Sequence, residues 1–261
     1  MKKEKITILI PCHNEEEGIA KVIDNVPHRA FNRYGFEAEI IVIDNNSSDR
    51  TREVAESKGA QVIFEHAKGK GNAMRKGFDC IGSDTEYVVM LDGDNTYDPS
   101  EMLRLIEPIT SGFCDVVVGS RLGGKVIKNA FKRQNRMVNW GYTFLVRSFY
   151  SANITDVLSG YFAWRRDVVV RLRDYLESEG FGIEMEMISK LIKLGYSIYS
   201  VPITYSMREG ETKIAPIKDG LKILFTLSRN LFWSPPEKAV NEEGVELLQV
   251  VGERETTDLI N

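Results

Sequence analysis

Cysteine and histidine are scarce in this sequence, with three of each among 261 residues. Cys12, Cys80 and Cys114 lie far apart and beside apolar residues. Their number is odd and their spacing matches no zinc site, which excludes a disulfide framework and a cysteine-based metal centre. The histidines form no metal-binding motif either. We therefore expect buried free thiols in a reducing compartment.

Long apolar runs and a strong excess of one charge are also missing. No run approaches the ~18 apolar residues expected of a membrane-spanning helix. The apolar run at residues 6–10 is too short for a secretory signal. The net charge of −4 gives no reason to expect nucleic acid as a partner. These absences predict a cytoplasmic protein that does not span a membrane.

Short apolar runs alternate with amphipathic runs through the first half of the chain. Strands alternating with helices of this length predict βαβ units and a mostly parallel sheet, hence an α/β nucleotide-binding architecture. The expected strands cover residues 6–10, 39–43, 61–64, 87–91 and 115–118. The expected helices cover residues 15–26, 49–58, 71–80 and 100–110.

The second half has a different composition. Basic residues alternate with aromatic residues over 126–150, and the pattern predicts further strands at 161–164 and 196–205 and an amphipathic helix at 216–233. After residue 235 the sequence becomes acidic and contains few aromatics. Such composition is typical of weakly structured segments. We expect one domain over residues 1–235 and an acidic, weakly structured tail over 236–261.

Asp92, Gly93 and Asp94 follow the apolar run at residues 87–91 directly. In open α/β sheets, ligands bind at the carboxyl ends of the strands. Carboxylate oxygens suit Mg²⁺ or Mn²⁺, which proteins often hold with one or two carboxylates and substrate phosphates. The alternative is an ordinary Asp-Gly turn.

Polar segments follow the other expected strands as well. They cover residues 11–15, 44–49, 68–72 and 119–121. Each alone could be a helix cap or a turn. Because the carboxyl ends of parallel strands meet at one edge of a sheet, all of them together favour a common site.

These segments, with residues 156–161 and 208–213, resemble the family 2 glycosyltransferases over roughly residues 4–235. The likeness is greatest to the dolichyl-phosphate or polyprenyl-phosphate sugar synthases. It implies the GT-A fold, a Rossmann-like α/β fold arranged as a three-layer αβα sandwich with a mostly parallel central sheet. It also implies an inverting, metal-dependent transfer of a sugar from a nucleotide sugar to a polyprenyl phosphate, feeding glycan or cell-envelope synthesis.

The resemblance assigns a role to each matching residue. Asp92 and Asp94 would hold Mg²⁺ or Mn²⁺ on the donor diphosphate, and with Arg121 they would form the catalytic set. Arg121 would also bind the phosphate of the acceptor, helped by Arg133 or Arg136. Besides the two aspartates, the residues that would bind the nucleotide sugar are Pro11, Asn14, Glu15, Asp44, Lys70, Gly93, Arg208 and Lys213.

The acceptor class decides whether a general base is needed. A phosphate monoester, with a second pKa near ~6, is mostly dianionic at neutral pH and can attack without losing a proton. A saccharide or protein hydroxyl would need a base, for which Glu184 or Glu186 is the candidate. A third alternative is a non-catalytic subunit that binds nucleotide sugars, against which the intact Asp92 and Asp94 argue.

Two positions depart from common family patterns. Asn45 stands where many relatives have a second aspartate, and Thr96 stands where mannosyl-phosphate synthases often have glutamine. The second departure favours UDP-glucose or UDP-N-acetylglucosamine over GDP-mannose as the donor.

Residues 138–149 and 217–233 combine apolar, aromatic and basic side chains. A basic amphipathic helix can lie in the interface of a bilayer, with tryptophan and tyrosine at the headgroup level. We therefore expect peripheral contact with the cytoplasmic face of a membrane or with a membrane-protein partner. Packing on the sheet or on a second copy in a homo-oligomer is the alternative.

Overall fold

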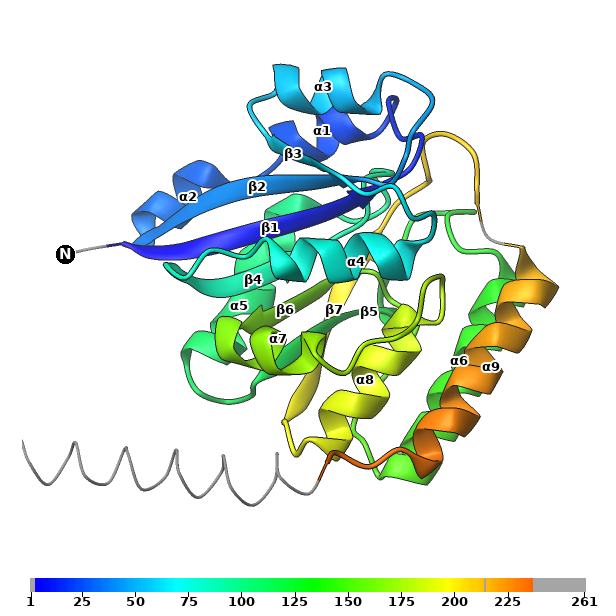
Figure 1. Cartoon of the computed structure of the whole chain (residues 1–261). Helices are drawn as coiled ribbons and strands as arrows, with labels where there is room; N and C mark the ends of the chain where they lie inside the picture. The colour runs from blue at the N-terminus through cyan, green and yellow to red at the C-terminus, as the bar shows by residue number, and fades with distance from the viewer. Residues whose placement is uncertain (1–2, 214, 237–261) are drawn as a thin grey trace, which may run out of the picture. The chain divides into compact units, whose positions relative to one another are not determined.

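The computed structural model describes residues 3–213 and 215–236, and the chain up to Leu231 forms one compact unit. Its centre is a seven-stranded sheet with the strand order β3-β2-β1-β4-β6-β5-β7 (Figure 1). The strands are β1 (Glu4–Cys12), β2 (Phe36–Asp44), β3 (Gln61–Phe64), β4 (Thr85–Met90), β5 (Val116–Val126), β6 (Phe162–Arg165) and β7 (Ile198–Tyr205). The predicted tail over 236–261 lies outside the described residues, apart from Pro236.

Among the described strands only β6 runs against the others. It pairs antiparallel with β4 and β5, whereas β1 pairs parallel with β2 and β4, and β5 pairs parallel with β7. The loops that follow β1, β2, β4 and β5 therefore emerge at one edge of the sheet, as the sequence predicted.

The sheet has an apolar core on each face, which confirms the three-layer αβα arrangement. Ile6, Ile8 and Ile10 of β1 face one core, while Leu9 faces the other, because successive side chains of a strand alternate. The first face is covered by α1 (Ile19–Asp24), α2 (His28–Arg33), α3 (Thr51–Ser57) and α5 (Met102–Thr110). The second core takes residues from α4 (Lys70–Asp79), α6 (Arg133–Tyr150), α7 (Arg166–Arg173), α8 (Ile183–Lys193) and α9 (Pro216–Phe232).

One expected helix is shorter than the sequence pattern indicated. Residues 15–26 were predicted as a single helix, but α1 begins only at Ile19, after a turn that starts at Glu15. A Cβ atom on Gly18 would lie 2.7 Å from the carbonyl oxygen of Gly93, so this turn passes against the loop that carries the two aspartates. Pro27 then separates α1 from the short helix α2.

The first turn of α4 packs closely on the loop that precedes α8. A Cβ atom on Gly71 would lie 1.9 Å from the carbonyl oxygen of Ser178, and the Asn72 backbone donates a hydrogen bond to the Glu179 carbonyl at 3.1 Å. Only glycine allows this approach. The contact fixes the position of Lys70, the first residue of α4.

We predict that Gly71→Ala lowers the free energy of unfolding by about 1–3 kcal/mol, because the new methyl group would overlap a backbone carbonyl. Gly141→Ala is the matched control. A Cβ atom on Gly141, inside α6, would meet no atom within 4 Å, so this change should be neutral or stabilise by up to about 1 kcal/mol. Urea unfolding measures both. Equal effects of the two substitutions would contradict the proposed packing.

Candidate active site

The loops after β1 and β2 are joined through Asn14. Its side-chain oxygen accepts a hydrogen bond from the Ser48 backbone at 2.8 Å, and its own backbone N–H donates to the Ser47 hydroxyl at 2.9 Å. Asn14 has φ +54°, in the left-handed region that asparagine tolerates better than most residues. The predicted site residue Asn14 therefore shapes the loops of the candidate site.

Asp94 is 3% exposed, and both of its carboxylate oxygens accept hydrogen bonds. Oδ1 accepts hydrogen bonds from the backbone N–H and the hydroxyl of Thr96, and Oδ2 accepts one from Arg208 Nη1. Burial and repulsion from Asp92 raise the pKa of Asp94, although Arg208 opposes the change. The two predicted metal ligands are therefore close enough to interact electrostatically.

Asp92 lies beside Lys70, as the sequence analysis expected for one site. Lys70 Nζ bridges Asp92 Oδ1 at 2.6 Å and Glu184 Oε1 at 2.7 Å. Burial lowers the pKa of Lys70, but attraction to Asp92 and Glu184 outweighs it and raises the pKa above its usual value. On the other side, a Cβ atom on Gly160 would lie 2.5 Å from Asp92 Oδ2, so the glycine makes room for this carboxylate.

Glu15 lies beneath two cations contributed by residues far along the chain. Its Oε1 accepts hydrogen bonds from Arg208 and, at 3.1 Å, from Lys213, which also donates to the Asn14 carbonyl at 2.7 Å. Burial raises the pKa of Glu15 to about 7, against the opposing effect of the two cations. Its Oε2 is buried and has no hydrogen-bond partner among the described residues. The structure thus brings Glu15, Asp94, Arg208 and Lys213 together.

Other predicted nucleotide-binding residues lie at the strand ends from which these loops emerge. Pro11 is buried at the end of β1, and a Cβ atom on Gly93 would lie 2.4 Å from the Cys12 sulfur. Asp44 is fully buried, and its Oδ2 pairs with Arg52 at 2.8 Å. The direct contact of Asp44 with a base or ribose stays a prediction.

Asn45 has a role that explains its departure from the family pattern. Its amide nitrogen donates to the Ala67 carbonyl at 2.7 Å, and its amide oxygen accepts from the Gly69 backbone at 2.7 Å. An ionised aspartate could accept but not donate. Asn45 thus holds the loop that leads into α4 and Lys70.

Arg121 is buried and paired with Asp156. Nε and Nη2 bond to the two Asp156 oxygens at 2.8 and 2.9 Å, and Nη2 also donates to the Leu158 carbonyl. Its guanidinium lies over the rings of Phe131 and Tyr205. Asp156 balances the charge of Arg121 and holds the residue in place, and contact of Arg121 with an acceptor phosphate stays a prediction.

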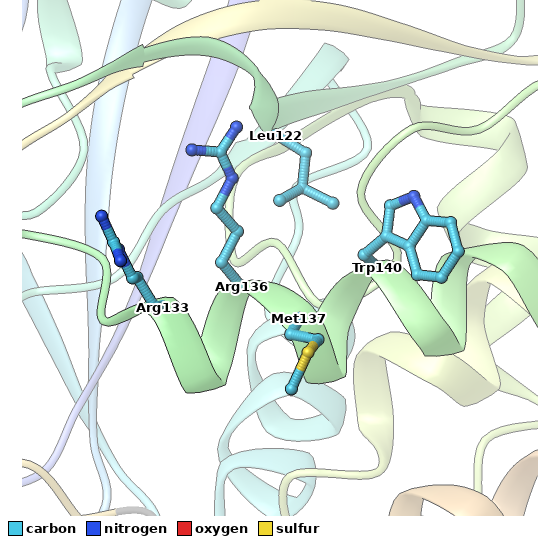
Figure 2. A pocket seen from close by; sticks show the side chains of 5 residues that line it. All are labelled: Leu122, Arg133, Arg136, Met137 and Trp140. Carbon is cyan, nitrogen blue, oxygen red and sulfur yellow. The ribbon is translucent and has the colours of Figure 1, made fainter.

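Arg133 and Arg136 lie in a different setting. Both project from the start of α6 into a groove of about 320 Å³, whose other lining residues are Leu122, Met137 and Trp140 (Figure 2). Both arginines are exposed, and neither has an ion-pair partner within the described ranges. The groove therefore offers uncompensated positive charge beside apolar surface.

The structure separates the two predicted base candidates. Glu184 joins the site through Lys70, whereas Glu186 is fully buried and accepts hydrogen bonds from the Ser178 backbone, Lys190 and Arg229. The hydrogen bonds from Lys190 and Ser178 lower the pKa of Glu186 despite its burial. Glu186 thus connects α8 and α9 to the preceding loop, and only Glu184 lies beside Asp92.

Two threonines support the site and were not singled out from the sequence for this role. Thr96 donates twice to Asp94, and the Thr51 hydroxyl accepts from the Glu15 backbone at 2.8 Å. The sequence pattern that could have indicated them is an aspartate followed two residues later by threonine, at Asp94 and again at Asp49. Such pairs form local hydrogen bonds between side chain and backbone.

The oxygen ligands of Asp92 and Asp94 suit a metal ion whose coordination is completed by substrate phosphates. No group of three or more His, Cys, Asp and Glu residues in the described part of the chain is arranged to hold a metal. Asp92 and Asp94 offer hard oxygen ligands, and Mg²⁺ in proteins is usually bound by one or two carboxylates together with substrate phosphates and water.

The family model described as Glycosyl transferase family 2 matches residues 7–173. The chain is 35% identical over 231 residues to the glycosyltransferase AglJ of Haloferax volcanii, covering 87% of this chain and 72% of that protein. It is 31% identical over 222 residues to a dolichyl-phosphate hexose transferase of the same organism, covering 84% and 91%.

A bacterial relative and a solved structure extend the comparison. An undecaprenyl-phosphate mannosyltransferase of Micrococcus luteus is 30% identical over 226 residues, covering 81% of this chain and 88% of that protein. Glucosyl-3-phosphoglycerate synthase of Mycobacterium tuberculosis, solved with Mn²⁺, UDP and glucosyl-3-phosphoglycerate, superposes with a TM-score of 0.68 at 20% identity. The match covers 90% of this chain and 82% of that one. At this identity the structural likeness establishes the fold alone.

Proposed function

The chain belongs to glycosyltransferase family 2, and from this premise we propose that it transfers a hexose from a nucleotide sugar to a polyprenyl phosphate, with inversion at the sugar. The observation that carries the proposal is the arrangement of Asp92 and Asp94 at the carboxyl edge of the sheet. Lys70 lies on one side of this pair, and Arg208 lies on the other.

The donor half of the site suits a leaving nucleoside diphosphate. Negative charge builds up on the diphosphate as the sugar departs, and fixed cations aimed at it stabilise the transition state. Arg208 pairs with Asp94 and Glu15, and Lys213 pairs with Glu15, so both supply such cations, and arginine also suits bidentate contact with phosphate. Mg²⁺ or Mn²⁺ held by Asp92 and Asp94 would neutralise further charge on the diphosphate.

The acceptor half of the proposal rests on the α6 groove. Arg133 and Arg136 provide positive charge for a phosphate, and Met137 and Trp140 provide apolar surface for the isoprenoid beside it. Arg121 stays in the proposed acceptor site, but because Asp156 balances its charge, we assign the net attraction for phosphate to the two exposed arginines. The names of the relatives, which include undecaprenyl-phosphate and dolichyl-phosphate transferases, support this acceptor class.

A hydroxyl acceptor is less well supported. It would need a base, and the one candidate that the structure brings to the site, Glu184, is paired at 2.7 Å with Lys70. A dianionic phosphate needs no such base. A non-catalytic subunit is disfavoured by the intact set of Asp92, Asp94, Arg208 and Lys213.

We further propose that the α6–α9 surface rests on the cytoplasmic face of an anionic membrane. The two helices lie side by side, joined by a hydrogen bond from Tyr142 to the Gly220 carbonyl (Figure 1). Helix α6 contains no acidic residue, and none of the described helices is long and apolar enough to cross a membrane. The large apolar residues that the two helices expose are Met137, Val138, Trp140, Phe144, Phe149, Ile217, Leu221, Leu224, Phe225 and Phe232.

A transfer assay tests the function. The protein is incubated with Mg²⁺, a short polyprenyl phosphate, and UDP-glucose, UDP-N-acetylglucosamine or GDP-mannose labelled in the sugar. We expect label in the organic extract from one donor, most readily a UDP-sugar. Asp94→Ala should abolish this transfer without loss of the folded state by circular dichroism, whereas the exposed Asp79→Ala should retain it. Label that enters only water-soluble hydroxyl acceptors would contradict the lipid-phosphate assignment.

The acceptor assignment predicts that Arg136→Gln raises the KM for polyprenyl phosphate about tenfold, the equivalent of about 1.4 kcal/mol, and leaves the KM for the donor unchanged. Arg147→Gln, which removes the same charge further along α6, should change neither value. Steady-state kinetics with each substrate varied in turn measures the effect. An equal rise in both KM values for Arg136→Gln would argue against phosphate binding in this groove.

For the membrane surface, we predict co-flotation with vesicles of equal parts phosphatidylcholine and phosphatidylglycerol, weakened by high salt because charge contributes to binding. Replacing Trp140 and Phe225 with serine should reduce the bound fraction several-fold. Phe113→Ser removes an equally exposed aromatic elsewhere on the chain and should have no effect. Unchanged flotation of the double variant would refute this surface as the docking face.

A further inference from the structure

Residues 206–213, which we call the clasp, connect β7 to the cations of the donor site. The clasp is fixed at its start by backbone hydrogen bonds to the loop that carries Asp94. The Ser206 N–H donates to the Thr96 carbonyl at 2.8 Å, and the Glu209 N–H donates to the Asp94 carbonyl at 3.0 Å. The clasp therefore continues the path of β7 across the metal-binding aspartates.

The Glu209 side chain ties the clasp to two further segments. Both of its oxygens lie within 2.8 Å of Lys21 Nζ on α1, and Oε1 also accepts a hydrogen bond from the Asn95 amide at 3.0 Å. Asn95 sits between Asp94 and Thr96 with φ +59°, so its side chain is presented by a constrained backbone. One carboxylate thus joins α1, the aspartate loop and the clasp.

These contacts adjoin Arg208 in the chain. Arg208 is the neighbour of Glu209 and reaches Asp94 and Glu15, while Lys213 reaches Glu15 from the far end of the clasp. A long cationic side chain has many rotamers, and ordering it costs conformational entropy unless its backbone is held. We propose that Glu209 is a positioning residue that holds Arg208 and Lys213 at the donor diphosphate; the inference rests on the proposed function.

Glu209 is suited to this role and contributes little to overall folding. Lys21 and Glu209 are both partly exposed, with side-chain exposures of 59% and 27%, and exposed ion pairs add little to global stability. Removing Glu209 should therefore loosen the clasp without unfolding the protein. A purely structural role would predict the reverse, a lower melting temperature with unchanged nucleotide affinity.

The test compares Glu209→Ala with Glu211→Ala, which removes an exposed carboxylate from the same clasp for which the described residues show no ion pair. Amide hydrogen exchange of residues 206–213 is measured in the free proteins, and binding of UDP with Mn²⁺ and of GDP with Mn²⁺ is measured by calorimetry. From the size of partly exposed charged contacts, we expect Glu209→Ala to speed exchange and weaken binding by about three- to tenfold. Glu211→Ala should match the wild type in both, and the melting temperatures of all three proteins should agree.

A double-mutant cycle assigns the effect to the pair. Lys21→Ala should reproduce much of the loss, and Lys21→Ala with Glu209→Ala should be no worse than Glu209→Ala alone, because residues that act as one unit are not additive. Normal exchange and binding in Glu209→Ala, or equal losses in Glu211→Ala, would overturn this inference alone. Failure of the wild-type protein to bind either nucleotide would overturn the proposed function and the inference with it.

Discussion

Charge balance among buried carboxylates is the constraint on which this site depends. Glu15, Asp94 and Glu184 are all buried. An unpaired charge in such surroundings is costly, so each must be met by a cation. The cations come from distant segments, since Lys70 begins α4 whereas Arg208 and Lys213 follow β7. The fold therefore brings the two halves of the chain together at the edge where a doubly charged diphosphate would bind.

The sequence predicted most of the fold because its signals are local. Short apolar runs and their alternation with amphipathic runs depend on neighbouring residues, and all the strands expected from them are present. The carboxyl edge followed from strand direction. The start of α1 was wrong because the pattern over residues 15–26 cannot show that Gly18 packs against the Gly93 carbonyl, a contact between segments far apart.

The site was predictable in its residue types but not in its pairings. Asp92, Asp94 and Arg208 could be named from motifs, yet nothing in the sequence indicates that Asp156, 35 positions away, takes up the charge of Arg121. Glu184 and Glu186 could not be separated either, because they are two residues apart on one short helix and only tertiary contacts give them different partners. Which cation pairs with which carboxylate depends on tertiary structure, and a single sequence does not give it.

The pairing of Glu186 with Arg229 has a practical consequence for protein engineering. Arg229 belongs to α9, while Glu186 holds the loop that packs on the first turn of α4. A truncation that deletes α9, made to ease purification or crystallisation, would leave the Glu186 carboxylate without one of its cations and would release the loop behind Lys70. Such a shortened enzyme would be expected to lose affinity for the proposed sugar donor, although none of the residues proposed to bind that donor had been removed. C-terminal truncations should therefore leave α9 intact.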